Sequence, residues 1–130
     1  VLQFAFDGQP DNPHLPRNHV PNCIAYTGTH DNDTTVGWYR TLDEKTRHIL
    51  RVTLSCSDEE APQAMMRAAL DSVARLSVIP LQDMLGLGSE ARMNTPGTTV
   101  GNWRWTFDWA QIPDSFRGQW QDLNRQYNRV

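Results

Sequence analysis

The chain has 130 residues and a formal net charge of −3, and 38% of its residues are hydrophobic. This length allows at most one domain, and an acidic balance without a basic cluster argues against nucleic acid as the main partner. The longest apolar stretch is interrupted by Arg67, Asp71 and Arg75, so we expect no membrane span. Cys23 and Cys56 lack metal-ligand spacing, which predicts reduced thiols rather than a metal site.

The first part of the chain predicts two strands separated by a loop. Residues 1–6 are apolar except for Gln3, as in a strand covered on both faces, and a single Gln there should have a specific hydrogen-bond partner. Residues 7–21 hold four prolines and predict a long loop. Residues 24–27 predict the second strand, after which Gly28 permits a close backbone approach.

Helical patterns follow the second strand. Residues 34–39 predict a first helical turn. The Thr-Leu-Asp-Glu sequence at 41–44 reads as a capping box that opens a helix ending near Ser55. Another helix begins at Ser57 or Ala61, with a proline in its first turn and methionines that we interpret as core filler.

The remainder of the chain predicts a third strand, a long loop and a last helix. Residues 77–85 are assigned to the strand, although Pro80 is awkward inside it. Residues 91–109 predict a loop with three tryptophans, and long loops in compact domains are usually functional. Apolar residues at helical spacing over 116–127 predict the helix. Strands alternating with helices indicate an α/β fold with a parallel sheet.

The most informative stretch is residues 23–39, where an apolar, β-prone half is followed by polar residues from His30 to Asp33. A buried strand that ends in polar groups is how α/β barrels build active sites. A plain turn is the alternative, because Asn and Asp bond their own backbone. The five tryptophans leave a similar choice between core packing and stacking against the apolar faces of sugars.

Three blocks of sequence resemble the amylomaltase family, the 4-alpha-glucanotransferases or disproportionating enzymes related to the α-amylases. The first is Tyr-Thr-Gly-Thr-His-Asp-Asn-Asp-Thr-Thr at 26–35, followed by Gly-Trp-Tyr at 37–39. The second is Val-Leu-Gln-Phe-Ala-Phe-Asp-Gly at 1–8. The third runs from Ser-Val-Ala-Arg-Leu at 72–76 through Pro-Leu-Gln-Asp-Met-Leu-Gly-Leu-Gly to Ala-Arg-Met-Asn, Pro-Gly and Gly-Asn-Trp at 101–103.

The resemblance implies that residues 1–130 form a single partial domain. They would be the C-terminal portion, about the last three βα units, of a TIM (β/α)8 barrel of the glycoside-hydrolase type. Its outer strands would then have unpaired edges, so we expect the chain to form dimers or swapped strands, or to be poorly soluble, when it is expressed alone.

The resemblance also implies an activity, the transfer of α-1,4-glucan segments to another glucan or to glucose by a retaining double displacement. Retention needs a nucleophile and an acid/base carboxyl group. In amylomaltases the nucleophilic Asp follows the fourth barrel strand and the acid/base Glu follows the fifth. Neither motif occurs here, so both would lie before Val1 and we expect the chain alone to be inactive. The chemistry needs no metal and no organic cofactor.

Residue roles carry over from the matched motifs. Asp31 matches the third acidic residue, which supports the transition state, and His30 would bind the same sugar ring. The other substrate-binding candidates are Gln82, Asn94, Pro96, Gly97 and Trp103. Gln82 and Asp83 end the last predicted strand and would face the same mouth of the barrel. The alternatives are a core histidine for His30, a turn residue for Asn94 and an internal ion pair with Arg92 for Asp83.

Two other classes are weighed against the transferase. A non-catalytic α-glucan-binding module would explain the missing carboxylates but not the exposed barrel edges. A metal phosphohydrolase built on His30 and Asp31 lacks further ligands at suitable spacing. The expected partners are an α-1,4-glucan or maltooligosaccharide and the N-terminal remainder of the barrel, without nucleic acid or membrane. Family habit suggests a cytoplasmic location, with a plastid as the alternative.

Overall fold

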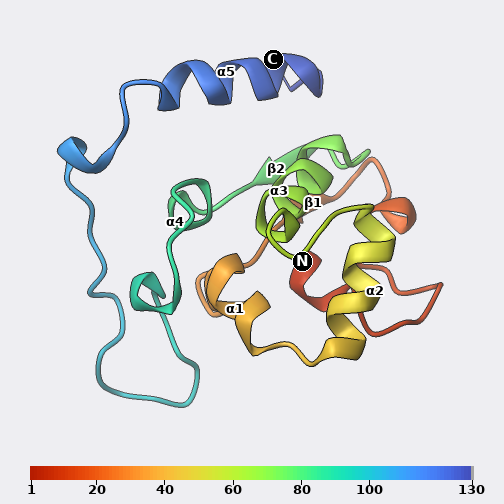
Figure 1. Ribbon diagram of the computed structural model, residues 1–130, viewed down its shortest axis with the longest axis horizontal. Helices are drawn as coiled ribbons and strands as arrows, with labels where there is room; N and C mark the ends of the chain where they lie inside the picture. Colours follow the sequence, from red (N-terminus) through yellow and green to blue (C-terminus); the bar gives the residue numbers. More distant parts are fainter. Residues whose placement is uncertain (130) are drawn as a thin grey trace.

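The computed structural model describes residues 1–129, which form an α/β arrangement of short strands and helices (Figure 1). In chain order the 3-10 helices (η), strands and α-helices are η1 (Leu2–Phe4), η2 (Pro16–Asn18), β1 (Ile24–Tyr26), α1 (Thr35–Thr41), α2 (Glu44–Leu54), α3 (Ala61–Asp71), β2 (Leu76–Val78), α4 (Leu81–Met84), η3 (Ser89–Ala91), η4 (Trp109–Gln111) and α5 (Phe116–Gln126).

Strands β1 and β2 pair in parallel, with Ile24 opposite Leu76 and Tyr26 opposite Val78. Parallel neighbours need a crossover connection, and here α1, α2 and α3 supply it. Helix α3 contacts both strands and both preceding helices, so it is the centre of the packing. The predicted parallel arrangement of these two strands is therefore confirmed.

The hydrophobic core lies between the N-terminal segment, β1 and the three crossover helices. Leu2, Leu50 and Met65 are the largest of its fully buried side chains. Burial of one such side chain contributes about 1.5–3 kcal/mol relative to exposure. Met65 and its neighbour Met66 are core residues, as the helical pattern predicted.

The predicted strand over residues 1–6 is wrong, because this segment contains the 3-10 turn η1 instead. Leu2, Ala5 and Phe6 are buried while Phe4 is 53% exposed, so the apolar residues face the core at helical rather than alternating spacing. The Asn12 side chain also bonds the Phe4 carbonyl at 2.8 Å, which occupies a group that a strand would need for pairing.

The predicted third strand is correct only at its start, since β2 ends at Val78 and α4 begins at Leu81. Pro80 explains the change. It has no N–H for a strand ladder, but its fixed φ suits the start of a helix, and its carbonyl accepts from the amides of Asp83 and Met84. The proline therefore ends the strand and begins the helix.

The helix predictions hold with one correction. Helix α1 runs through Thr41, so the capping box predicted at residues 41–44 is wrong. Asp43 caps α2 instead, and its carboxylate accepts from the Thr46 amide at 2.8 Å. Helix α2 ends at Leu54, and Ser55 follows in the left-handed conformation, close to the predicted end. Helix α3 begins at Ala61 with Pro62 in its first turn, as expected.

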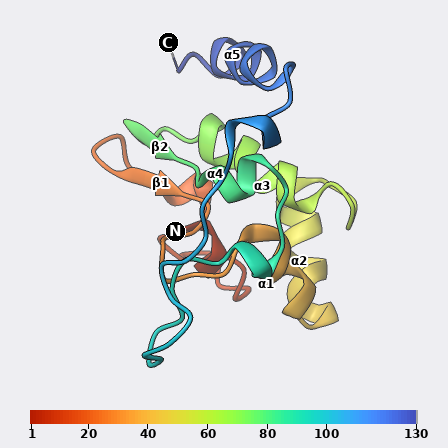
Figure 2. The ribbon, with the colours of Figure 1, turned by 90° about the vertical axis from the view of Figure 1, so that its left-hand side faces the viewer.

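Residues 95–115, called the arm below, are irregular except for η4, and α5 follows them as predicted. Figures 1 and 2 both show the arm looping away from the strands before the chain reaches α5, and residues of α3 and α5 line a common hollow. The Arg129 guanidinium ties this end of the chain to α3, because it donates to the carbonyls of Leu70 and Ala74 at 2.7 and 2.5 Å. None of the helices within residues 1–129 is long and apolar enough to cross a membrane.

Candidate functional site

Residues 28–34, called the rim loop below, connect the end of β1 to the start of α1. The side-chain Oδ1 of Asn32 accepts from the amide and the hydroxyl of Thr29, both at 2.9 Å. Thr34 then caps α1 by accepting from the Gly37 amide at 3.1 Å. The turn considered from the sequence is therefore real, and it leaves the side chains of His30 and Asp31 more than half exposed.

Groups distant in sequence hold the middle of the rim loop. The side-chain Nε2 of Gln3 donates to the Asp33 main-chain carbonyl at 2.9 Å, which confirms that this buried Gln has a specific partner. The Ser89 hydroxyl donates to the Asp33 carboxylate at 2.6 Å. A Cβ on Gly28 would lie only 2.7 Å from the Gln3 side-chain nitrogen, so the predicted close approach at this glycine is confirmed.

Asp31 stands at the outer surface of the rim loop, and about half of its side chain is exposed. Its Oδ1 accepts from Asn94 Nδ2 at 2.7 Å and lies 3.3 Å from His30 Nε2. Within residues 1–129, Oδ2 has no hydrogen-bond partner, which leaves it available to a ligand. The His30 side chain is 57% exposed, so the alternative of a core histidine is wrong.

Main-chain and side-chain hydrogen bonds connect residues 92–94 to the rim loop. The Asn94 amide donates to the His30 carbonyl at 3.1 Å, and Arg92 donates to the Asp31 carbonyl at 2.8 Å. The Trp103 amide bonds the Met93 carbonyl at 2.7 Å, and its indole lies 5.2 Å from the His30 ring. These contacts bring His30, Asp31, Asn94 and Trp103 together.

Trp103 adopts a left-handed backbone conformation, with φ at +59°. This conformation is unfavourable for a bulky residue and persists only where the surroundings impose it. The bond to Met93 and the contact with His30 are those constraints here, and they leave the residue 59% exposed. Trp103 is therefore a fixed, accessible aromatic surface beside His30.

A hollow of about 450 Å³ lies between the rim loop, the end of β2 and residues 92–93. His30, Asn32 and Gln82 are among the residues that line it, whereas Asp31 stands beside it. Gln82 is buried, and its side-chain Nε2 donates to the Ala91 main-chain carbonyl at 3.2 Å. Parallel-strand folds place ligands at the carboxyl ends of their strands, which is where this hollow opens.

Pro96 and Gly97 are not brought to the hollow. Both are exposed in a turn at the start of the arm, where the Thr98 amide bonds the Thr95 carbonyl at 3.2 Å. Their predicted role in sugar binding stays a prediction.

Asp83 lines the same hollow as Gln82, at the mouth where the sequence placed both residues. It is buried, with 3% of its surface exposed, and accepts hydrogen bonds from Thr27 and Thr35. The alternative of an ion pair with Arg92 is wrong, because the Arg92 guanidinium bonds the carbonyls of Asp31 and Asn94 instead. Nothing in the sequence pointed to the two threonines as the partners of Asp83.

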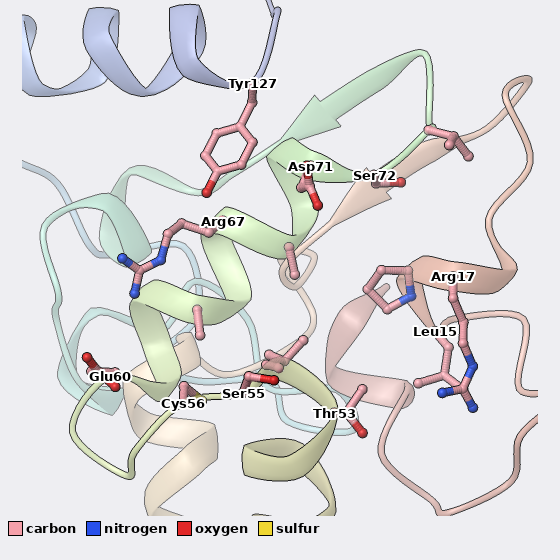
Figure 3. A pocket seen from close by; sticks show the side chains of 15 residues that line it. Leu15, Arg17, Thr53, Ser55, Cys56, Glu60, Arg67, Asp71, Ser72 and Tyr127 are labelled. Atoms are coloured by element: carbon pink, nitrogen blue, oxygen red, sulfur yellow. The ribbon is translucent and has the colours of Figure 1, made fainter.

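A larger hollow of about 620 Å³ lies on the other side of α3, lined by η2, the end of α2, α3 and Tyr127 (Figure 3). Arg67 and Asp71 project from α3 there, and Tyr127 extends towards Arg67 from the end of α5. No residue singled out as a functional candidate from the sequence lines this hollow. The described residues also contain no group of three or more His, Cys, Asp or Glu side chains that could hold a metal ion.

Comparison with known proteins gives consistent matches. A family model described as 4-alpha-glucanotransferase matches residues 1–111. The chain is 51% identical over 116 residues to the chloroplastic/amyloplastic 4-alpha-glucanotransferase of Solanum tuberosum, covering 88% of this chain and 19% of that protein. It is 45% identical over 131 residues to the 4-alpha-glucanotransferase of Synechocystis, covering 99% of this chain and 26% of that protein.

A solved structure shares the fold over nearly the whole chain. The amylomaltase of Streptococcus agalactiae, solved in complex with acarbose, superposes with a TM-score of 0.92 at 26% identity. The match covers 98% of this chain and 26% of that chain. The chain thus spans about a fifth to a quarter of the length of these three relatives.

Proposed function

The chain belongs to the 4-alpha-glucanotransferase family, and on that premise we propose that it supplies one rim of the active site of such a transferase. The resemblance read from the three sequence blocks is thereby confirmed. The complete protein transfers α-1,4-glucan segments to another glucan or to glucose with retention. The observation that carries the proposal is Asp31, which has one carboxylate oxygen held by Asn94 and the other open, beside a hollow at the ends of parallel strands.

In this proposal the chain is the C-terminal part of a (β/α)8 barrel. The two-stranded parallel sheet supports it, because both strands have an unpaired edge within residues 1–129. Ile24, Leu76 and Val78 are 47%, 51% and 37% exposed, so apolar strand surface is left for further strands to cover. Barrel closure removes such edges. The N-terminal remainder of the same barrel is therefore the proposed partner.

Asp31 acts as the transition-state stabiliser. An ionised carboxylate accepts sugar hydroxyl bonds that are charge-assisted and therefore strong. Such bonds assist catalysis to the extent that they strengthen as positive charge develops on the sugar ring. His30, whose Nε2 lies 3.3 Å from Asp31 Oδ1, binds the same ring, and Asn94 Nδ2 keeps the Asp31 carboxylate oriented.

The described residues offer no second carboxylate for a retaining reaction at this site. Asp33 uses both oxygens, accepting from the Thr34 amide at 2.8 Å and from Ser89 at 2.6 Å. Asp83 is buried and fully engaged. Retention needs two carboxyl groups about 5 Å apart. The nucleophile and the acid/base therefore come from the rest of the barrel, and the chain alone is inactive.

Substrate binding falls to the groups around Asp31. Trp103 presents its indole face to a sugar, and Gln82 forms the floor of the hollow. Asn94, Pro96 and Gly97 line the approach of the acceptor. The similar amylomaltase of Streptococcus agalactiae was solved with acarbose, which supports an oligosaccharide ligand. The carboxylates supply the chemistry, so the reaction needs no metal or organic cofactor.

The location of the protein stays a prediction. The relatives include plant proteins named chloroplastic/amyloplastic and bacterial proteins, so either the cytoplasm or a plastid fits the family.

The test is incubation of the full-length protein that contains this chain with maltotriose. We expect glucose together with maltooligosaccharides longer than the substrate, resolved by chromatography. The isolated chain should give no products and no change in tryptophan fluorescence with maltotriose. Products absent from the full-length reaction would contradict the transferase. Millimolar or tighter binding by the isolated chain, without transfer by the full-length protein, would support the α-glucan-binding module instead.

A further inference from the structure

We propose that Asp83 is the positioning residue of the rim loop, a buried carboxylate that joins the two ends of the loop and thereby sets the place of Asp31. The inference rests on the proposed function, because it assigns Asp83 a role in that site without contact with sugar.

The contacts of Asp83 reach both ends of the rim loop. Its Oδ2 accepts from the hydroxyls of Thr27 and Thr35 at 2.6 and 2.7 Å, and its Oδ1 accepts from the Thr35 amide at 2.7 Å. Thr27 follows β1 and Thr35 begins α1, whereas Asp83 belongs to α4. One side chain from a third element therefore closes the loop.

The burial of these three residues makes the junction rigid. Thr27 and Thr35 are fully buried, at 0% and 1% exposure, and Asp83 is 3% exposed. No Lys, Arg or His in the described part of the chain forms an ion pair with Asp83, so hydrogen bonds alone satisfy its carboxylate. Burying the carboxylate without the donors of Thr27 and Thr35 would be strongly unfavourable. The hydrogen bonds from these donors are also directional. Any displacement of either threonine therefore loses a bond that water cannot replace.

Asp31 lies midway between the two tethered threonines, four residues from each. The middle of the loop is held separately, through Asp33 and through Asn94. With its ends fixed by Asp83, the loop presents the Asp31 carboxylate in one place. Catalytic groups are sensitive to such placement, because a displacement of about 1 Å can lower the rate about 100-fold.

The experiment compares D83N with S77A in the full-length protein. The D83N side chain keeps its size but has an NH2 group in place of one oxygen, so at least one of the three donors from Thr27 and Thr35 loses its acceptor. We expect kcat for maltotriose disproportionation, normalised to folded protein by circular dichroism, to fall about 10- to 100-fold with KM changed less than threefold. T27S and T35S retain their hydroxyl donors and should keep kcat near the wild-type value.

Ser77 provides the matched control, because it lies in β2 and its hydroxyl bonds the Ala69 carbonyl at 2.5 Å without touching the rim loop. S77A should lower the melting temperature and leave kcat per folded molecule unchanged. If D83N lowered only the melting temperature, as S77A does, Asp83 would be a structural residue and the proposal would fail.

A second readout does not depend on activity. Hydrogen exchange of the amides of residues 29–33 should become at least about tenfold faster in D83N and stay at the wild-type rate in S77A. Unchanged exchange in D83N would overturn the proposal. A wild-type protein without transferase activity would refute the proposed function, whereas the exchange measurement would still decide the role of Asp83. If D83N does not fold, T27V removes one of the three donors and is judged by the same two measurements.

Discussion

The rim loop and the arm are both irregular and rich in polar and aromatic residues, but they are held in different ways. The side chains of Gln3 and Ser89 donate hydrogen bonds to the rim loop from outside it, and Asp83 accepts from Thr35, directly after the loop. The arm bonds mainly to itself, as in the pair of bonds that links Asn102 with Thr95 and Thr98.

The aromatic side chains of the arm show the same difference. The Phe107 ring contacts Trp105 and Trp109, at centroid distances of 6.1 and 5.2 Å, and Trp109 is 79% exposed. Only Trp103 reaches the rim loop. A segment tied to distant parts of the chain has its shape before any ligand arrives, whereas an exposed apolar segment needs further protein to cover it. The rim loop therefore has its shape within this chain, and under the proposed function we expect the rest of the proposed barrel to cover the arm.

The largest expected effect comes from removing the charge of Asp31 in the rim loop. D31N should lower kcat of the full-length transferase about 100- to 1000-fold, the range seen when one group that stabilises transition-state charge is lost. The melting temperature should stay within a degree or two, because the side chain is half exposed. D122N, an equivalent change on exposed α5, is the control and should keep full activity. Full activity in D31N would remove Asp31 from the mechanism.

A smaller effect on kcat is expected at Asn94, which directly precedes the arm and bonds Asp31 in the rim loop. N94A removes the 2.7 Å bond to Asp31 Oδ1, and hydrogen bonds to charged groups contribute about 1.5–3 kcal/mol. We expect kcat to fall about tenfold or more, measured as initial rates with maltotriose. N124A on α5 serves as the matched substitution. A change in KM alone would instead assign Asn94 to sugar binding.

Trp103 and Trp109 test the comparison directly, because one contacts the rim loop and the other does not. W103A should raise KM for maltooligosaccharides about 3- to 10-fold, the size of one aromatic stacking contact, with little change in kcat. W109A should leave KM near the wild-type value. It should lower the melting temperature of the full-length protein, in which we expect the arm to be covered. Equal KM values for the two variants would show that contact with His30 has no bearing on sugar binding.

The smallest expected effect is on stability and concerns Asp58, which contacts the end of α1 farthest from the rim loop. The Tyr39 hydroxyl and the Arg51 guanidinium donate to Asp58, and these bonds lower the pKa of its carboxyl. A carboxyl whose pKa is lower in the folded state stabilises the fold above its unfolded pKa, about 3.9, and loses that contribution as pH falls through the folded value.

D58N should therefore melt slightly below the wild type at pH 7, and the difference should shrink as pH falls below about 4 and vanish below the folded pKa of Asp58. Calorimetry from pH 7 to pH 2 measures it. A difference of the same size at pH 7 and pH 2 would mean that the charge of Asp58 is not its cause.

The sequence by itself determined helices α1, α2, α3 and α5, the parallel strand pair and the polar run from His30 to Asp33. These features follow from local spacing, capping residues and the apolar pattern, which act over a few neighbouring residues. It also determined the family, because the matched blocks extend over most of the chain.

Only the tertiary structure decided the features that depend on distant partners. Residues 1–6 are apolar enough for a strand or a turn, and packing of Leu2 and Phe6 into the core selected the turn. Asp83 could have formed an ion pair, but the two threonines that reach it lie 48 and 56 residues away. Hydrogen-bond partners of a buried side chain are set by where the elements meet in space, and no local pattern encodes that position.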